Sequence, residues 1–211
     1  RCAIIVPEGA LFGSTSAHIE LRQKLLEDFE VLAVVSLPAG VFKPYAGVKT
    51  SIVIFRRPQA IAEHIKEKGR REREAREVRR NSKVWFYEIK NDGYDTEKIS
   101  SGGRPETPER NEIPEMLRQW KIYRDSGFKN PPGNEAGALL APGTEEAKCW
   151  WAKASTIAET EFNLGAGRYK PQVGEKPPDE DAAELIGKML KLERGIASKL
   201  EKLLKDLEAV A

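Results

Sequence analysis

Two short apolar runs flank a helical pattern at the start of the chain, and this order restricts the fold more than any other feature. Residues 2–6 and 31–37 are nearly continuous apolar runs, which suit strands buried on both faces of a sheet. Between them, Ser16 is a candidate N-cap, and apolar residues follow it at helical spacing: Ile19, Leu21, Leu25, Leu26 and Phe29. A strand, a helix and a second strand predict an α/β fold with a right-handed crossover.

A third strand is predicted at Ser51 to Phe55, after a loop from Pro38 to Lys49. The loop is too short for a crossover helix, so this strand should run antiparallel to a neighbour. The start of the chain should therefore form the end of a mostly parallel sheet, with two parallel strands and one reversed strand. The first run opens the sequence without an initiator Met. We therefore expect it to lack an upstream neighbour, and we expect its unpaired edge to favour self-association.

The composition changes to mostly charged residues after the third strand. Six Arg and three Glu lie between Arg70 and Arg80. Glu and Arg stand four residues apart here, which favours a solvated helix, whereas contact with DNA phosphates is the functional alternative. Strand character returns at 84–89, and Gly/Pro-rich loops follow. The pattern divides the chain into four parts: a sheet segment 1–57, a charged helical arm 58–83 (with 59–80 as its Arg-rich core), a mixed extension 84–178 and a helix 179–211.

The last segment has the clearest periodicity in the chain. Its apolar residues step by three or four: Leu185, Met189, Leu192, Ile196, Leu200, Leu203, Leu207 and Val210. Gly187 and Gly195 interrupt the pattern, and each costs about 1 kcal/mol of helix propensity relative to Ala. A narrow apolar stripe on a long helix predicts a partner helix.

Composition excludes several classes of protein. The formal net charge is only +2, so no overall field indicates nucleic acid. The two cysteines, Cys2 and Cys149, form no disulfide or zinc pattern, and a reducing cytoplasm suits them. His18 and His64 are isolated, and we expect no metal site. No apolar run approaches the roughly 20 residues that span a bilayer.

Two passages resemble a known family. Residues 3–13 (AIIVPEGALFG) look like the late strand-and-turn motif of N6-adenine DNA methyltransferases. Residues 34–42 (VVSLPAGVF) with 47–52 (GVKTSI) are similar to the target-base loop of type I restriction-modification subunits. Weaker likeness continues at 84–87 and 149–151 and resumes at 162–169 (FNLGAGRY). The resemblance implies the C-terminal part of a Rossmann-like methyltransferase subunit.

The resemblance also assigns roles in the 38–49 loop. An adenine must be flipped out of the duplex before its amine can react, so a pocket must receive it. Phe42, with Pro38 and Gly40, would line this pocket, and Lys43 and Lys49 are candidate phosphate contacts. By residue type alone, Phe42 is more often a core anchor, and Pro7, Gly9 and Gly13 are equally well turn residues.

The catalytic and cofactor motifs of the family are not found in this sequence. Asn130-Pro131-Pro132-Gly133 is similar to the family's Asn-Pro-Pro-aromatic motif, but Gly133 cannot stack on a base, and the segment follows the target-base loop instead of preceding it. We therefore predict a loop. The glycine pairs at 102–103 and 165–167 follow no buried strand, so they are weak matches to an S-adenosylmethionine site. The intact subunit would use S-adenosylmethionine, whereas this chain alone should bind no cofactor and transfer no methyl group.

Two functions follow from these patterns. The first is part of a site-specific DNA adenine-N6 methyltransferase in a type I complex, with DNA, a specificity subunit (through 179–211) and a restriction subunit as partners. In it, the adenine amine would attack the methyl-sulfonium directly, without a covalent enzyme intermediate. The second is a non-catalytic DNA- or protein-interaction module that kept the fold and lost the site.

Overall fold

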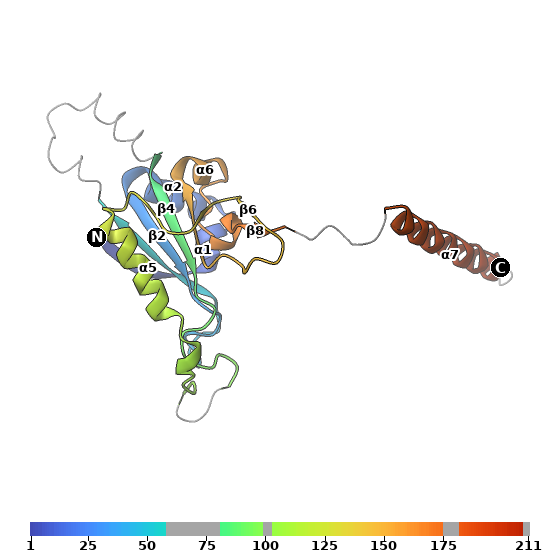
Figure 1. Ribbon diagram of the computed structural model, residues 1–211, viewed down its shortest axis with the longest axis horizontal. Helices are drawn as coiled ribbons and strands as arrows, with labels where there is room; N and C mark the ends of the chain where they lie inside the picture. Colours follow the sequence, from blue (N-terminus) through green and yellow to red (C-terminus); the bar gives the residue numbers. More distant parts are fainter. Residues whose placement is uncertain (58–80, 99–102, 175–181, 209–211) are drawn as a thin grey trace. The chain divides into compact units, whose positions relative to one another are not determined.

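The computed structural model describes residues 1–57, 81–98, 103–174 and 182–208 (Figure 1). Arg1–Val173 form one compact unit and Gly174–Ala211 a second, and each is described by itself. Residues 58–80 of the predicted charged arm lie outside the described residues. The chain is a mixed α/β protein.

A six-stranded mixed sheet forms the centre of the first unit, in the order β1-β3-β2-β4-β7-β5. β3 lies antiparallel between β1 and β2, β4 is parallel to β2, and β7 is antiparallel to β4 and parallel to β5. The reversed third strand predicted from the short loop is therefore confirmed. The strands are β1 (Cys2–Pro7), β2 (Glu30–Ser36), β3 (Thr50–Arg56), β4 (Lys83–Glu88), β5 (Asn134–Glu135) and β7 (Cys149–Lys153).

Helices cover both faces of the sheet (Figure 1). One face packs against α1 (Glu8–Phe12), α2 (Ser16–Asp28), α6 (Ala154–Glu159) and the short helix η2 (Ala166–Tyr169). The other packs against α5 (Ile113–Asp125), which follows η1 (Pro108–Arg110). β6 (Leu139–Leu140) and β8 (Gln172–Val173) form a small parallel pair of their own. The extension thus adds strands and helices to the same sheet as residues 1–57.

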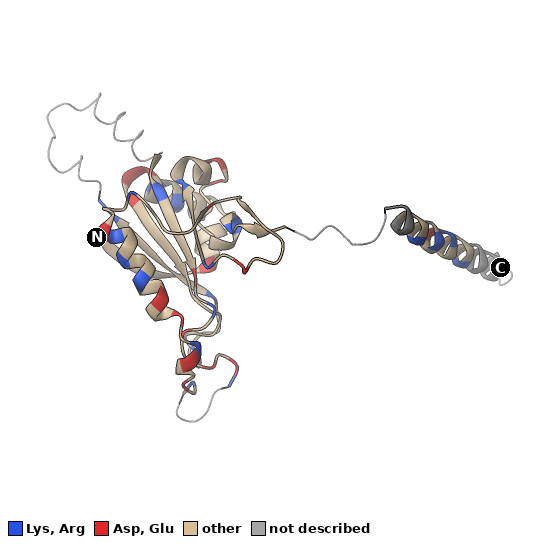
Figure 2. Ribbon diagram, in the orientation of Figure 1, with Lys and Arg blue, Asp and Glu red and all other residues tan. Residues whose placement is uncertain are grey.

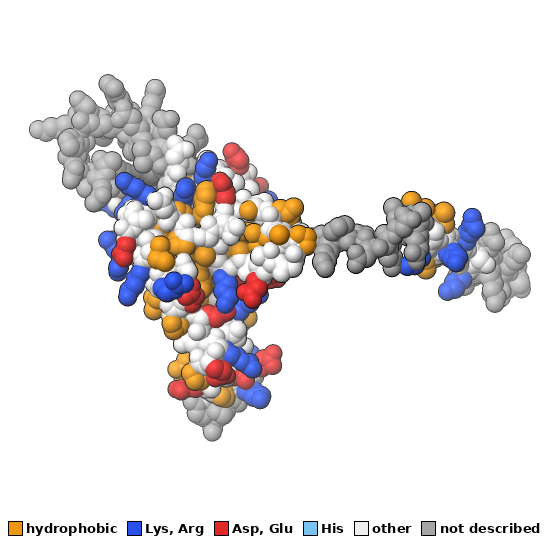
Figure 3. All heavy atoms as spheres, in the orientation of Figure 1, with side chains coloured by type: hydrophobic (Ala, Val, Ile, Leu, Met, Phe, Trp, Pro, Cys, Tyr) orange, Lys and Arg blue, Asp and Glu red, His pale blue; other side chains and the backbone are white. Residues whose placement is uncertain are grey.

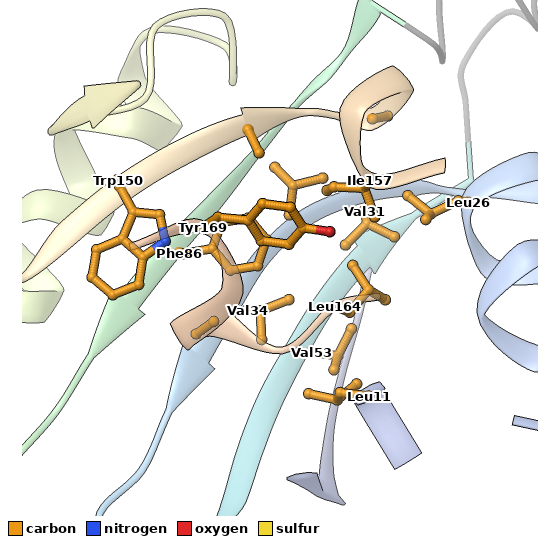
Figure 4. Packing of buried hydrophobic residues seen from close by; sticks show 14 residues of the cluster. Leu11, Leu26, Val31, Val34, Val53, Phe86, Trp150, Ile157, Leu164 and Tyr169 are labelled. Carbon is orange, nitrogen blue, oxygen red and sulfur yellow. The ribbon is translucent and has the colours of Figure 1, made fainter. Parts of the chain in front are cut away.

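Side chains that alternate along β4 divide the core into two clusters. Val84 and Phe86 belong to the first cluster, where Leu26, Ile157 and Leu164 are also buried (Figure 4). Trp85 and Tyr87 point to the opposite face, in the cluster with Tyr123 and Phe128 of the α5 side. Burial raises the pKa of Tyr87 to about 12, and its hydroxyl has no partner among the described residues. Alternation with a period of two is what a strand covered on both faces requires.

The first strand differs from the prediction. Residues 2–6 were expected to be buried on both faces, but β1 lies at the sheet edge, pairs only with β3 among the described strands, and is mostly exposed. Ile4 is 44% and Ile5 54% exposed. The expectation was wrong because the apolar composition of a strand does not show whether elements of the same chain cover its two faces.

Local details of the helices also differ from the sequence-based expectations. Thr15, not Ser16, is the N-cap of α2, and its hydroxyl accepts a hydrogen bond from the His18 amide at 3.4 Å.

The second unit contains α7 (Ala182–Glu208). Its described apolar side chains are exposed within that unit (Figure 3): Ile186, Met189, Leu190, Leu192, Ile196 and Leu200.

Candidate functional site

The 38–49 loop joins the end of β2 to the start of β3. The amide of Leu37 donates to the Thr50 carbonyl at 2.9 Å and closes the base of the loop. Within the loop, the amides of Tyr45 and Ala46 both donate to the Phe42 carbonyl, at 2.9 and 3.0 Å. β2 and β4 are parallel and both end at this edge of the sheet. Ligands of open α/β sheets bind outside the carboxyl ends of such strands.

The three residues predicted to line a pocket occupy different environments. Pro38 and Gly40 are buried, and Gly40 has a φ of +81°, a conformation that favours glycine. A Cβ at Gly40 would also lie only 3.0 Å from Cε of Lys43. Phe42 is 37% exposed and belongs to neither buried cluster. The tight turn at Gly40 therefore leaves the Phe42 ring at the surface of the loop, and Tyr45 beyond it is 95% exposed.

Lys49 is held at the end of the loop by the turn that follows β1. Its ammonium lies 3.2 Å from Oε1 of Glu8, and the Glu8 amide donates to the Lys49 carbonyl at 3.0 Å. Ser36 Oγ donates to the same carboxylate oxygen at 2.9 Å. The late strand-and-turn motif and the loop motif, which are 28 residues apart at Glu8 and Ser36, therefore meet in the fold.

Lys43 and Arg104 connect the loop to the segment after β4. This segment, here called the 91–107 segment, is described at residues 91–98 and 103–107. Lys43 Nζ donates to the Thr96 carbonyl at 2.8 Å, and Arg104 Nη1 donates to the Val41 carbonyl at 3.0 Å. The Val41 carbonyl before Phe42 and the Lys43 side chain after it are thus bound to the same segment.

Arg104 uses all five of its N–H groups. It forms a bidentate pair with Asp92, with Nη1–Oδ2 at 2.7 Å and Nη2–Oδ1 at 2.6 Å. The other three bonds go to the carbonyls of Val41, Tyr94 and Asp95. Its side chain is only 8% exposed, and the hydrogen bond to Asp92 raises the pKa of the guanidinium. A planar donor fork suits this arrangement, and lysine cannot reproduce it.

A second buried arginine joins the strand-and-turn motif to the 162–169 motif. Arg22 of α2 is 3% exposed and donates four hydrogen bonds to the carbonyls of Ala10, Gly13, Glu161 and Phe162. Burial lowers the pKa of its guanidinium. The Leu164 amide also donates to the Leu11 carbonyl at 2.8 Å. Two passages that resemble the same family are therefore packed together.

Sequence reasoning missed Glu8, Arg22 and Arg104 as organising residues. A charged residue in a helix or a polar loop is usually solvated, and the carbonyls that Arg22 binds at Glu161 and Phe162 are 139 and 140 residues away. No local pattern signals such a contact.

The 130–133 segment has a structural role. The Pro132 carbonyl accepts a hydrogen bond from Nε1 of Trp85 at 3.1 Å, and Gly133 has a φ of +93°. A Cβ at Gly133 would lie 2.3 Å from the Cys149 carbonyl oxygen. The backbone of this loop therefore approaches β7 closely, and the Gly at its fourth position is required for that approach.

The described part of the chain contains neither a cluster of metal-ligand side chains nor a membrane-spanning helix. Within residues 1–57, 81–98, 103–174 and 182–208, no group of three or more His, Cys, Asp or Glu could hold a metal ion. In the same residues, no helix has the length and apolar character needed to cross a bilayer. Acidic and basic side chains are interspersed over the first unit, with Lys and Arg along α5 (Figure 2).

Comparison with known proteins identifies the family. The N-6 DNA Methylase family matches residues 1–177, most of the chain. The chain belongs to this family. It is 33% identical over 88 residues to the type I restriction enzyme EcoEI methylase subunit of Escherichia coli, a match that covers 42% of this chain and 14% of that protein. The resemblance to type I methyltransferase subunits found in the sequence is therefore confirmed.

Two solved structures are similar to this chain. A chain from a type I restriction-modification assembly matches with a TM-score of 0.50 and 27% identity, over 98% of this chain and 35% of that one. The type I methyltransferase subunit of Streptococcus thermophilus matches with a TM-score of 0.48 and 19% identity, over 81% of this chain and 26% of that one. The N-6 DNA methylase chain thus spans about a third or less of the length of these relatives.

Proposed function

We propose that this chain forms the target-base side of a type I DNA adenine-N6 methyltransferase subunit, with the 38–49 loop receiving the flipped base. The observation that carries the proposal is the exposed Phe42 ring on a loop that is held at the Val41 carbonyl before it and at the Lys43 side chain after it. An aromatic side chain that is exposed on a fixed loop can stack on a base without a prior rearrangement. The position of the loop at the carboxyl ends of β2 and β4 supports the same role.

Each candidate residue would have a distinct task. Phe42 would contact the face of the adenine, and the tight turn at Pro38 and Gly40 would keep the backbone away from it. Lys49 is 40% exposed in its side chain while it pairs with Glu8, so N–H groups of its ammonium remain for a DNA phosphate. Lys43 donates one hydrogen bond to Thr96, so N–H groups of its ammonium also remain for a DNA phosphate.

The residues at these strand ends do not fit S-adenosylmethionine. A cofactor site of this kind needs a free carboxylate beside a glycine-rich turn. Glu8, after β1, is engaged by Ser36 and Lys49, and Asp92, after β4, is engaged on both oxygens by Arg104. We therefore assign to this chain the binding of the base and not of the cofactor, which the rest of a complete subunit would hold.

Two exposed apolar surfaces are assigned to partners. The α7 side chains from Ile186 to Leu200 are uncovered within their own unit, and a helix of the specificity subunit would cover them. The edge of β1 that pairs with none of the described strands, with Ile4 and Ile5 exposed, would pair with a strand outside this chain. In the isolated chain, the same edge would favour self-association, and light scattering that shows a single monomeric species at high concentration would contradict this.

Replacement of Phe42 tests the proposed function. In a complete modification enzyme that carries this chain, Phe42→Ala should reduce the methyl-transfer rate to an adenine site by about fivefold or more, because stacking on a base contributes roughly 1–3 kcal/mol. Leu117→Ala, at a 49% exposed apolar residue on α5, is the matched control and should leave the rate unchanged. An unchanged rate in Phe42→Ala would contradict the proposal and favour a non-catalytic interaction module.

A further inference from the structure

We infer that Arg104, through its pair with Asp92, is a positioning residue that fixes the Phe42 loop. This inference rests on the proposed function for its catalytic consequence, but the contact itself is independent of it. Arg104 donates a hydrogen bond to the Val41 carbonyl of the loop, and Lys43 of the loop donates one to the Thr96 carbonyl of the segment. The residues immediately before and after Phe42 are thus bound to one segment.

The burial and bonding of Arg104 distinguish it from an ordinary surface arginine. Its side chain is 8% exposed and that of Asp92 is 10% exposed. By contrast, the side chains of Arg118 and Glu115 on α5, which also form a bidentate pair, are 65% and 44% exposed. An exposed pair of this kind contributes little, whereas a buried guanidinium needs all its donors satisfied. Arg104 meets that requirement only when the Val41 carbonyl accepts a hydrogen bond from its Nη1.

The 91–107 segment holds the loop through polar contacts and not through the core. Among its described residues, 91–98 and 103–107, none belongs to either buried apolar cluster. Backbone pairing between Tyr94 and Glu106 and the Asp95–Pro105 hydrogen bond of 2.9 Å give the segment its own shape. Arg104 and Lys43 then connect it to the loop. Loss of Arg104 should therefore release the loop without unfolding the sheet.

A fixed loop has a direct advantage for base flipping. A loop that is already ordered in the free protein loses less conformational entropy when the base enters. The orientation of the Phe42 ring would thus be determined by residues about 50 to 60 positions further along the chain, in the extension that follows β4. This places a determinant of base positioning in the extension.

Hydrogen exchange in the 211-residue chain tests the contact. In Arg104→Gln, exchange at the amides of Tyr45 and Ala46 should accelerate about tenfold or more, while exchange in β2 and β3 stays as in the unchanged chain. Arg104→Lys should give an intermediate rate, and Arg110→Gln, at an exposed arginine, should give none of this acceleration. Unchanged loop exchange in Arg104→Gln would overturn the inference. If that variant does not fold, Arg104→Lys carries the test, because lysine cannot reproduce the bidentate pair with Asp92 together with the bond to Val41, and unchanged loop exchange in Arg104→Lys would overturn the inference.

A fluorescent base at the target position tests the catalytic consequence. In a complete modification enzyme, 2-aminopurine placed at the target adenine should brighten on binding, and Arg104→Gln should reduce this signal while DNA affinity changes less than threefold. A role in stability alone would leave the signal per folded enzyme unchanged. If Phe42→Ala has no effect on methyl transfer while Arg104→Gln still frees the loop, the proposed function fails and the contact stands. If Phe42→Ala abolishes transfer and Arg104→Gln leaves loop exchange and brightening unchanged, the positioning inference fails alone.

Discussion

Two irregular segments of this chain are each held by a buried arginine, but by different chemistry. Arg22 binds two carbonyls of the 161–169 turn and two after β1, at Ala10 and Gly13. None of these four bonds goes to a carboxylate, and burial lowers the pKa of its guanidinium. Arg104 binds Asp92 and two carbonyls within the 91–107 segment and the Val41 carbonyl of the 38–49 loop, and the pKa of its guanidinium is raised. The first segment also buries Leu164, Ala166 and Tyr169 in the core, whereas the second contributes no residue to either cluster.

The contrast separates a structural role from a positioning role. The 161–169 turn is part of the hydrophobic core, so its arginine helps to determine whether the sheet is covered at all. The 91–107 segment lies outside the core, so its arginine determines where one loop lies. Substitutions in the first region should change global stability, and those in the second should mainly change local exchange.

The largest expected effect is the loss of core packing in the 161–169 turn. Leu164→Ala should lower the free energy of unfolding by about 3 to 4 kcal/mol, because Leu164 is fully buried beside Leu11 and Ile157. Tyr94→Ala, in the other region, should change it by less than about 1 kcal/mol, since Tyr94 is 43% exposed and its ring contacts the Arg104 guanidinium at 5.5 Å. Urea unfolding followed by circular dichroism measures both, and equal losses would remove the distinction between the regions.

A smaller loss is expected when Arg22 is removed. Arg22→Ala leaves four carbonyls without their donor and should lower the free energy of unfolding by about 2 to 3 kcal/mol. Arg168→Ala, at an exposed arginine in the same turn, is the matched control and should change stability by less than about 0.5 kcal/mol. The same urea titration applies, and a stable Arg22→Ala protein would show that the turn is held by packing alone.

The smallest effect concerns pH at the start of the 91–107 segment. Burial acts to raise the pKa of Glu112, but hydrogen bonds from Lys148 and from the amides of Lys90 and Asn91 outweigh it, so the pKa lies below its usual 4.5. The ionised carboxylate is therefore stabilising above about pH 4.5, and this contribution is lost as the pH falls through the lower folded pKa.

Glu112→Gln should consequently destabilise the chain by about 1 kcal/mol at pH 7 and by less at pH 3. Thermal unfolding at the two pH values measures the difference. Glu109→Gln, whose side chain is 68% exposed, serves as the control and should show no dependence of this kind. A Glu112 effect that is the same at both pH values would contradict the assignment of the stabilisation to the charged form.

The sequence predicted the elements of the sheet better than their surroundings. β2 and β3 follow from apolar runs and loop length, because periodicity and chain reach are local properties. The burial of β1 was predicted wrongly, since the sequence of an apolar strand does not show whether the elements that cover it belong to the same chain. The 38–49 loop was found by resemblance, and its supports were not: Arg104 reaches Val41 across 63 positions, and no local pattern encodes such a contact.

The order of the strands has a consequence for the connection between β3 and β4. These two strands flank β2, so they lie two inter-strand spacings apart, or about 10 Å. β3 runs opposite to β2 and β4 runs along it, so the exit from β3 and the entry to β4 are at the same end of the sheet. About four extended residues could bridge that gap. The sheet therefore requires only a connection much shorter than the one in this chain. A short turn between Arg57 and Asn81 should leave every strand pairing in register.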